Sequence, residues 1–152
     1  MNRRSVLASV LALAACTGVP TETQVQTTAA LVTAGVDAVA ASVLATPGLA
    51  STTATEINSA VATVNAANQT IQQATTTVPT DAQAIVSAVK IAAPMLLAQL
   101  DPKSKSPEAM AANAAMALLP TILAAAGVAS ASGKPTMDPA QATLILKGYT
   151  GK

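Results

Sequence analysis

Helix start and stop signals recur along this chain at regular intervals and divide it into segments of helical length. A start signal combines Ser, Thr or Asp with an acid, an amide or Pro in the next turn, because these residues satisfy the unpaired backbone N–H groups of a first turn. Starts occur at Thr21, Thr53, Thr80, Ser106 and Asp138. Stops occur at Pro47-Gly48, Pro79, Asp101-Pro102, Gly127 and Gly133-Lys134-Pro135. The pattern predicts helices over 21–45, 53–77, 81–100, 107–126 and 139–147.

The residue content favours the same fold class. Hydrophobic residues make up 51% of the chain, but aromatic residues only 1%, and Ala and Thr fill more than a third of the positions. Ala has the highest helix propensity, whereas strands prefer Val, Ile, Tyr and Phe in alternation. We therefore predict an all-α fold: an Ala-rich antiparallel helical bundle of about four main helices plus a short C-terminal helix, behind a cleaved signal helix.

Two stripes of branched side chains are expected to join the first two helices. The stripe on the first helix comprises Val25, Val32, Val36, Val39 and Val43, and that on the second comprises Ile57, Val61, Val64, Asn68 and Ile71. Steps of three and four residues place each set on one helical face, as in a coiled-coil seam. We call these sets the Val/Ile stripes. The Thr46-Pro47-Gly48 turn lets the helices fold back on each other, and self-association through the stripes is a further expectation.

Asn68 interrupts the second stripe and has two interpretations. A polar residue in a seam can specify register or oligomeric state. Alternatively, its amide lies at the solvent-facing edge of a short seam. The second interpretation is the simpler one.

The region 84–129 contains two apolar segments with few polar residues. Residues 109–129 carry no charge, and a polar turn at 101–106 separates them from the preceding apolar helix. Pro94 and Pro120 should kink these helices, because proline lacks an N–H group and its ring clashes with the preceding turn. Since most apolar positions are Ala, we expect core helices of a soluble bundle. A membrane hairpin is the alternative, because uncharged stretches of this length can span a bilayer.

Charge and reactive residues exclude several functions. Without the two leader arginines, the chain has six lysines and seven acids, so its net charge is slightly negative. Aromatic residues for base stacking are also lacking, and we therefore expect no nucleic-acid partner. The chain has no His and a single Cys, which excludes a Cys/His metal site and a disulfide within the chain. The acids occur singly, several of them at helix starts, and Lys90 suits a lysine at a bundle edge. We expect no enzyme activity, no cofactor and no small-molecule substrate.

The first 16 residues have the features of a secretory leader. Asn2, Arg3 and Arg4 form a polar, positive start, and residues 5–15 are apolar or small. A segment of this length is too short for a stable transmembrane helix. The paired arginines also resemble a twin-arginine export signal, although two arginines are ordinary in a secretory leader.

The end of this leader resembles the lipobox of bacterial lipoprotein precursors. The matching residues are Leu13, Ala14, Ala15 and Cys16, and Cys16 is the only cysteine of the chain. The resemblance implies that the Cys16 thiol receives a diacylglycerol and that Cys16 becomes the new N-terminus. Several acyl chains on one residue anchor a protein durably, whereas one chain does so only marginally. Thr17 after the cysteine, in place of Asp, implies an outer-membrane location facing the periplasm.

The C-terminal Lys152 has a counterpart in the murein lipoprotein, a helical protein joined to peptidoglycan through its last lysine. The resemblance covers Lys152 and the nearby Tyr149, and the prolines of this chain depart from the continuous coiled coil of that family. Peptidoglycan attachment through Lys152 is therefore an alternative, and a tail that happens to end in lysine is the simpler interpretation.

Together these features predict the following organisation: a signal peptide over 1–15, a lipidated tether over 16–20, a helical hairpin over 21–79, an apolar helical hairpin over 80–129 and a polar tail with a short helix over 130–152. The expected function is structural or protein-binding, in a cell-envelope lipoprotein held to the membrane by lipid on Cys16. The alternatives are membrane activity, such as lysis or envelope disruption by an inserted 84–129 hairpin, and peptidoglycan attachment through Lys152.

Overall fold

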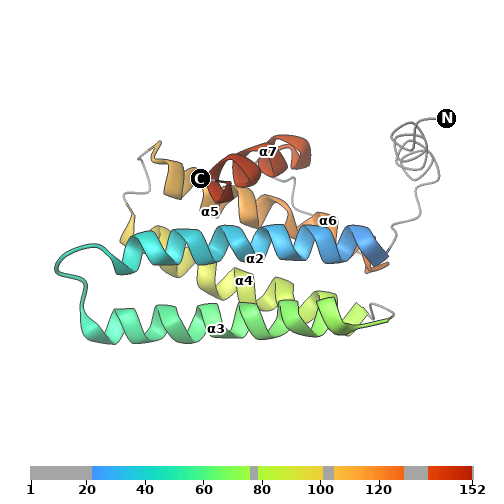
Figure 1. Ribbon diagram of the computed structural model, residues 1–152, viewed down its shortest axis with the longest axis horizontal. Coiled ribbons are helices and arrows are strands. Elements are labelled where there is room, and N and C mark those ends of the chain that lie inside the picture. Colours follow the sequence, from blue (N-terminus) through green and yellow to red (C-terminus); the bar gives the residue numbers. More distant parts are fainter. Residues whose placement is uncertain (1–21, 76–78, 101–104, 129–136, 152) are drawn as a thin grey trace.

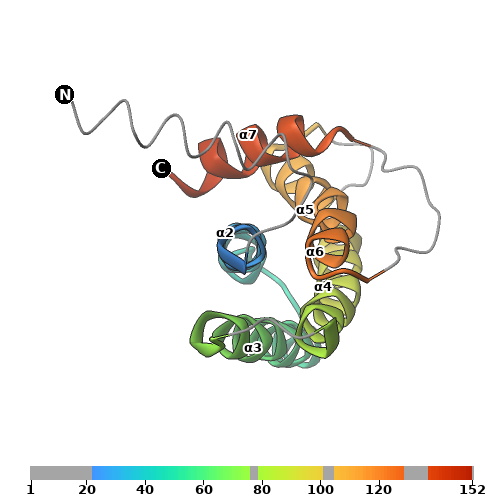
Figure 2. The same cartoon turned by 90° about the vertical axis from the view of Figure 1, so that its right-hand side faces the viewer.

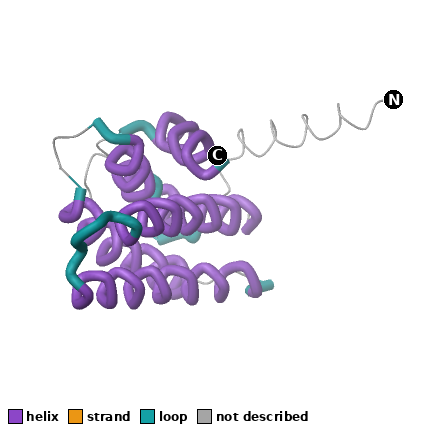
Figure 3. The backbone as a smooth tube through the Cα atoms, turned by 60° about the vertical axis from the view of Figure 1, so that its left-hand side comes forward, coloured by secondary structure: helices purple, strands orange, loops and turns teal. Residues whose placement is uncertain are grey.

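The computed structural model describes residues 22–75, 79–100, 105–128 and 137–151, and these ranges form an all-α bundle (Figure 1). Its helices are α2 (Glu22–Leu44), α3 (Ser51–Gln73), α4 (Pro79–Gln99), α5 (Pro107–Ala117), α6 (Leu119–Ala125) and α7 (Pro139–Thr150). Within the described ranges no residue is in a strand, as the colouring of Figure 3 also shows. The prediction of an Ala-rich helical bundle is confirmed.

Helix α2 is the central element of the bundle. It contacts each of the other described helices, and α3, α4, the α5–α6 segment and α7 are arranged in a curve around it (Figure 2). Successive long helices run antiparallel, with α2, α3 and α4 crossing the bundle in alternating directions (Figure 1). The turn between α2 and α3 contains Gly48 with a φ of 87°, a left-handed conformation that favours glycine.

The Val/Ile stripes form the inner seam of the bundle. All five valines of the α2 stripe are buried, and so are Ile57, Val64 and Ile71 of the α3 stripe. Val61 is half-buried. The same hydrophobic cluster includes residues of α4, α5, α6 and α7, so the two predicted hairpins share one core. Because the stripes are covered within a single chain, they are not free to bind a second copy in this fold.

Alanine makes up a large share of the remaining core. On α5 every buried residue is alanine: Ala109, Ala111, Ala112, Ala114, Ala115 and Ala117. Small side chains let helices approach closely, but each buries little apolar area, and hydrophobic stabilisation scales with that area. The core of this bundle is therefore built from many small contributions.

Side-chain amides tie α2 to α3 at two levels. Near one end, Gln26 Nε2 donates to the carbonyl oxygens of Ile71 (3.2 Å) and Ala74 (3.3 Å), while Gln72 Nε2 donates to Gln26 O (2.8 Å). Nearer the other end, Asn65 Nδ2 donates to Asp37 Oδ1 (2.9 Å). These bonds cap free carbonyls at the end of α3 and hold the register of the two helices.

Two of the predicted helix starts are confirmed in atomic detail. The Ser106 side chain accepts a hydrogen bond from Ala109 N, with Pro107 as the first helical residue. The Asp138 carboxylate likewise accepts from Ala140 N at the start of α7, which extends to Thr150, three residues beyond the predicted end.

Two other predicted starts are wrong, and a further one lies outside the described residues. Helix α3 begins at Ser51 rather than at Thr53, and its cap residue Ala50 has no side-chain hydrogen bond. Helix α4 begins at Pro79, so Thr80 lies inside the helix and cannot cap it. Proline fits the first turn of a helix, where its missing N–H is not needed. Thr21, the predicted start of α2, is not among the described residues.

The two internal prolines behave differently. Helix α4 continues from Pro79 to Gln99 across Pro94. By contrast, the predicted helix 107–126 is divided at Leu118 into α5 and α6, and Pro120 lies in the first turn of α6. Without an N–H group Pro120 cannot donate to the turn before it, so the chain restarts a helix at this point. Proline therefore interrupts the helix at Pro120, whereas α4 continues through Pro94 as one helix.

Candidate functional site

The residues that carry the sequence-based functional predictions lie outside the described part of the chain. Leu13, Ala14, Ala15 and Cys16 precede the first described residue, Glu22, and Lys152 follows the last, Gly151. Five residues separate Cys16 from Glu22, which makes six Cα–Cα steps. A chain extends by at most about 3.3–3.6 Å per residue, so Cys16 lies within about 20 Å of the start of α2.

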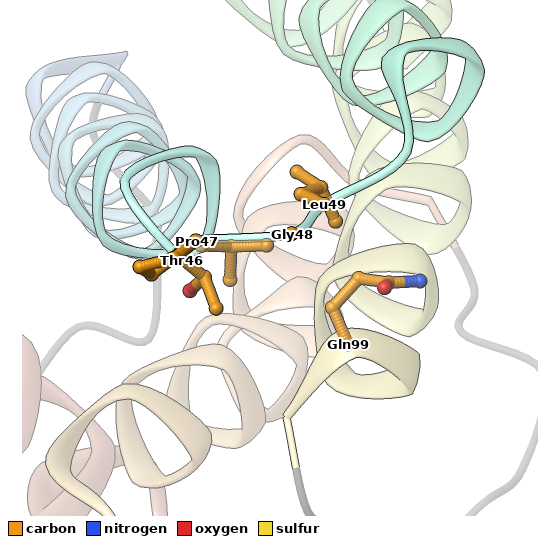
Figure 4. Close-up of a pocket in the computed structure, with 6 residues that line it drawn as sticks. Thr46, Pro47, Gly48, Leu49 and Gln99 are labelled. Carbon is orange, nitrogen blue, oxygen red and sulfur yellow. The ribbon is translucent and has the colours of Figure 1, made fainter.

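A shallow pocket of about 160 Å³ lies at the opposite end of α2 (Figure 4). Its lining residues are Val43, Thr46, Pro47, Gly48, Leu49 and Gln99. The turn after α2 supplies most of these residues, and the last residue of α4 supplies the amide of Gln99. At about 1.5 Å per residue, the 23 residues of α2 separate this pocket from Glu22 by roughly 35 Å.

The chemistry available in this pocket is limited. Figure 4 shows the Gln99 amide across from the Thr46–Leu49 turn, and no acid or lysine is among the lining residues. The pocket can therefore hold a small apolar group and offer it a hydroxyl or an amide, but it has no group for proton transfer. The Pro-Gly turn was predicted from the sequence; the approach of Gln99 to it, across 50 residues, had no sequence signal.

A second depression, lined by Ser51, Thr52, Thr55 and Glu56, lies on the first turns of α3. It is open to solvent, and Glu56 is its only ionisable residue. All four side chains come from one helix, so the depression is a feature of the α3 surface rather than a cleft between elements.

Tyr149, the only aromatic residue of the chain, lies where α7 meets α2 and α5. Partial burial raises the pKa of its phenol above the ordinary value of 10.0, and the negative charge of Glu108 raises it further. A hydrogen bond with the Ser42 side chain lowers the pKa and offsets part of this effect. The phenol is therefore neutral at physiological pH.

Other polar candidates do not converge on a common site. Within the described ranges no three His, Cys, Asp or Glu residues lie close enough to hold a metal ion. Lys90 is exposed on α4, and Asn68 is half-buried with its Oδ1 accepting from Gln72 Nε2 on the next turn (3.2 Å). This bond within α3 favours the interpretation of Asn68 as an amide at the edge of the seam.

Three stretches of the described chain are long and apolar enough to cross a membrane by length and composition: Glu22–Leu44, Pro79–Gln99 and Pro107–Ala125. About half of each apolar window is buried inside the bundle. The apolar residues that qualify these helices as spans are therefore in large part the residues that pack the core.

Comparison with protein-family models, with curated proteins and with solved structures finds no match to this chain.

Proposed function

We propose that this chain is the precursor of a cell-envelope lipoprotein, in which lipid on Cys16 holds a helical bundle at a membrane and the bundle serves a structural or protein-binding role. The observation that carries this proposal is Leu13-Ala14-Ala15-Cys16 directly after an apolar segment with Arg3 and Arg4 before it. The single cysteine of the chain stands at the one position where lipidation requires it.

The short distance between Cys16 and the bundle supports a role for the bundle at the membrane surface. The bundle begins six residues after Cys16, which leaves a short tether and little chain between lipid and folded body. The pockets of the described surface are open depressions lined by Thr, Ser and aliphatic side chains with Gln99 or Glu56. We further propose that the anchoring membrane is the outer membrane, with the bundle in the periplasm.

Mass analysis of the mature protein tests the anchor. We expect an N-terminal Cys16 peptide carrying a diacylglycerol and an added acyl chain, and a Cys16→Ser variant that lacks this mass. A mature protein that retains residues 1–15, or one with a free Cys16 thiol, would contradict the proposal. Separation of inner and outer membranes then reports the location.

Membrane activity is the second candidate, and the three span-length apolar helices favour it. A chain that starts at Thr17 behind a non-lipidating signal peptide separates the two functions. If this chain is soluble after cell fractionation, the lipid is the sole anchor and the bundle is a periplasmic module. If it resists a carbonate wash of the membranes, residues 84–129 are an independent membrane element.

Peptidoglycan attachment through Lys152 is a third candidate with a separate test. Digestion of purified cell wall with lysozyme should release a muropeptide linked to the C-terminal peptide, and Lys152→Arg should abolish this product. A C-terminal peptide recovered only in unmodified form would remove this candidate.

A further inference from the structure

The exposed large apolar side chains lie on three of the helices, α4, α5 and α7. Among the described residues these are Ile91 on α4 (61% exposed), Met110 on α5 (42%) and Leu144 on α7 (72%). Helices α4, α5 and α7 follow one another around α2, since α4 contacts α5 and α5 contacts α7 (Figure 2). Helix α3, by contrast, carries no exposed large apolar residue and presents Thr, Ser, Asn and Gln to solvent.

Each of these apolar residues points away from the core of the bundle. On α4 the exposed positions follow one another in steps of three and four residues, which places them on a single helical face: Ala84, Ser87, Ile91, Pro94 and Ala98. The buried side of α4 contains Ile85, Val89 and Leu96. On α7, Leu144 lies two residues from each of the buried residues Ala142 and Leu146, hence across the helix from them.

The described lysines lie on, or directly before, the helices that carry the exposed apolar residues. Lys90 is adjacent to Ile91, Lys147 is one helical turn after Leu144, and Lys105 precedes the first turn of α5, which contains Met110. All three lysines are exposed. We call the six residues Ile91, Met110, Leu144, Lys90, Lys105 and Lys147 the basic apolar arc.

The acids of these helices occupy different positions. Asp81, Glu108 and Asp138 lie at or before the first turns of α4, α5 and α7, where they complement the helix N-termini. Asp138 accepts a hydrogen bond from Ala140 N, and Glu108 lies near the Tyr149 phenol. Lys90 and Lys147 are each nine residues after the acid at the start of their helix, whereas Lys105 lies three residues before Glu108.

We propose that the basic apolar arc lies on the surface of an anionic phospholipid bilayer, with Ile91, Met110 and Leu144 in the headgroup region and the three lysines beside lipid phosphates. Apolar side chains flanked by lysines are the combination that binds membrane interfaces, because burial of apolar area and attraction to anionic lipid act together. The α3 side, with Glu56 and no lysine, faces away from the membrane.

The tether makes such a contact effective even when the arc binds weakly. This step rests on the proposed lipid anchor on Cys16. The five residues between Cys16 and Glu22 can span at most about 20 Å, so that binding of the arc becomes an intramolecular step at high effective concentration.

Fluorophores placed at single cysteines of the lipidated protein test the contact. Lipidation consumes the Cys16 thiol, so Ile91→Cys, Met110→Cys and Leu144→Cys each offer one thiol to an environment-sensitive dye. Ser59→Cys, at an exposed position on α3, is the matched control. Each labelled protein is reconstituted into vesicles of phosphatidylcholine, with or without phosphatidylglycerol. A Cys16 that also takes the dye would show that the anchor itself is missing, which is a separate failure.

In vesicles that contain phosphatidylglycerol, we expect blue-shifted emission and protection from an aqueous quencher at positions 91, 110 and 144, with position 59 fully quenched. Lys90→Gln and Lys147→Gln should each weaken the contact about fivefold, since one lysine near an anionic surface contributes on the order of 1 kcal/mol. In phosphatidylcholine alone or at high salt, protection should fall.

Three results would overturn the proposal. Full quenching at all four positions on anchored protein would show that the arc stays in water. Protection that includes position 59 would indicate insertion or aggregation of the whole bundle. Equal protection in neutral and anionic vesicles would show that the lysines do not recognise lipid charge.

Discussion

The Leu146 side chain of α7 packs directly onto the Cα of Gly35 in the middle of α2, so that a Cβ atom at position 35 would overlap Leu146 Cδ2. Leu146 is completely buried, and with Ala142 it makes up the buried residues of α7. The absence of a side chain at Gly35 is therefore what allows the last helix to approach the central one.

Gly35→Ala should destabilise the bundle although it adds helix propensity to α2. The propensity gain is about 0.5–1 kcal/mol, whereas overpacking a buried contact costs about 1–3 kcal/mol. We expect a net loss of about 1 kcal/mol in denaturant unfolding. In a Leu146→Ala background the same change should become stabilising, because the obstructing atoms are gone.

The matched control is Gly148→Ala on α7. With no atom within 4 Å of its added Cβ, this change should stabilise the protein by about 0.5–1 kcal/mol. Equal effects at positions 35 and 148 would contradict this account of the contact.

Thr33→Val should stabilise the protein. Thr33 is 4% exposed, and its Oγ1 atom is buried without a hydrogen-bond partner. Gln26 and Asp37 both make hydrogen bonds to α3. Thr33 lies seven residues after Gln26 and four before Asp37, so it lies on the same face of α2, the face toward α3. Valine has nearly the same shape and removes the cost of an unpaired buried hydroxyl, so we expect a gain of about 1 kcal/mol in unfolding free energy.

The matched control for Thr33 is Thr27→Val on the same helix. Thr27 is exposed, and its Oγ1 donates to Thr23 O (2.7 Å). Its replacement should change stability by no more than about 0.5 kcal/mol, as expected for a surface position. A loss of stability in Thr33→Val would indicate that the hydroxyl has a partner in solution.

Pro94→Ala should stabilise α4. Pro94 is exposed in the interior of this helix, where proline removes a backbone hydrogen bond and crowds the preceding turn, at a cost of about 3 kcal/mol in an ordinary helix. Part of that cost is expected to be relieved by local bending, so a gain of about 1–2 kcal/mol should appear in thermal unfolding. Pro107→Ala, at the first position of α5, should have little effect or a small loss. Similar effects of the two changes would argue that Pro94 does not strain the helix.

Tyr149 should confer a pH dependence on stability at alkaline pH. Its pKa is raised in the folded state by burial and by Glu108, so the folded protein binds the phenolic proton more tightly than the unfolded chain. Its contribution is then complete below pH 10 and is lost as the pH rises through the folded-state value. Because the chain has one tyrosine and no tryptophan, tyrosinate absorbance follows this group alone.

Two variants test the causes of this pKa shift. Glu108→Gln should bring the midpoint of the absorbance titration closer to the ordinary tyrosine value, because a negative neighbour is removed. Tyr149→Phe should reduce the loss of stability above pH 10, because the group whose pKa is raised in the folded state has been removed. A midpoint at or below the ordinary value in the unmodified protein would contradict the burial of the phenol.

The variants Ala115→Lys and Asn113→Lys test whether α5 packs in the core of a bundle or is exposed to lipid. Ala115 is completely buried on α5, whereas Asn113, two residues earlier, is exposed. In a folded bundle, lysine at position 115 should abolish folding, since burying an unpaired charge costs several kcal/mol, while lysine at position 113 should be tolerated. Circular dichroism and solubility of the two variants provide the comparison. A folded, membrane-bound Ala115→Lys protein would favour the membrane-active function.

Local sequence was sufficient to predict most of the helices and their inner faces, because caps, prolines and hydrophobic spacing act within a few residues. Ser106-Pro107 and Asp138-Pro139 start helices where expected, and the Val/Ile stripes are buried. The starts at Thr53 and Thr80 were wrong because the favourable cap residues were not used: α3 begins behind Ala50, and Pro79 itself serves as an early residue of α4.

The tertiary structure alone decided how these helices are assembled. An Ala-rich surface can pack against many partners with similar energy, so periodicity could not show that α2 is central, that Leu146 meets Gly35 or that Gln99 closes a pocket at the Thr46–Leu49 turn. The grouping of exposed Ile, Met, Leu and Lys residues on α4, α5 and α7 is likewise a property of the assembled bundle. Sequence determined which segments are helical because helix formation depends on neighbours in the chain, whereas the contacts between distant segments depend on shape complementarity that exists only in the fold.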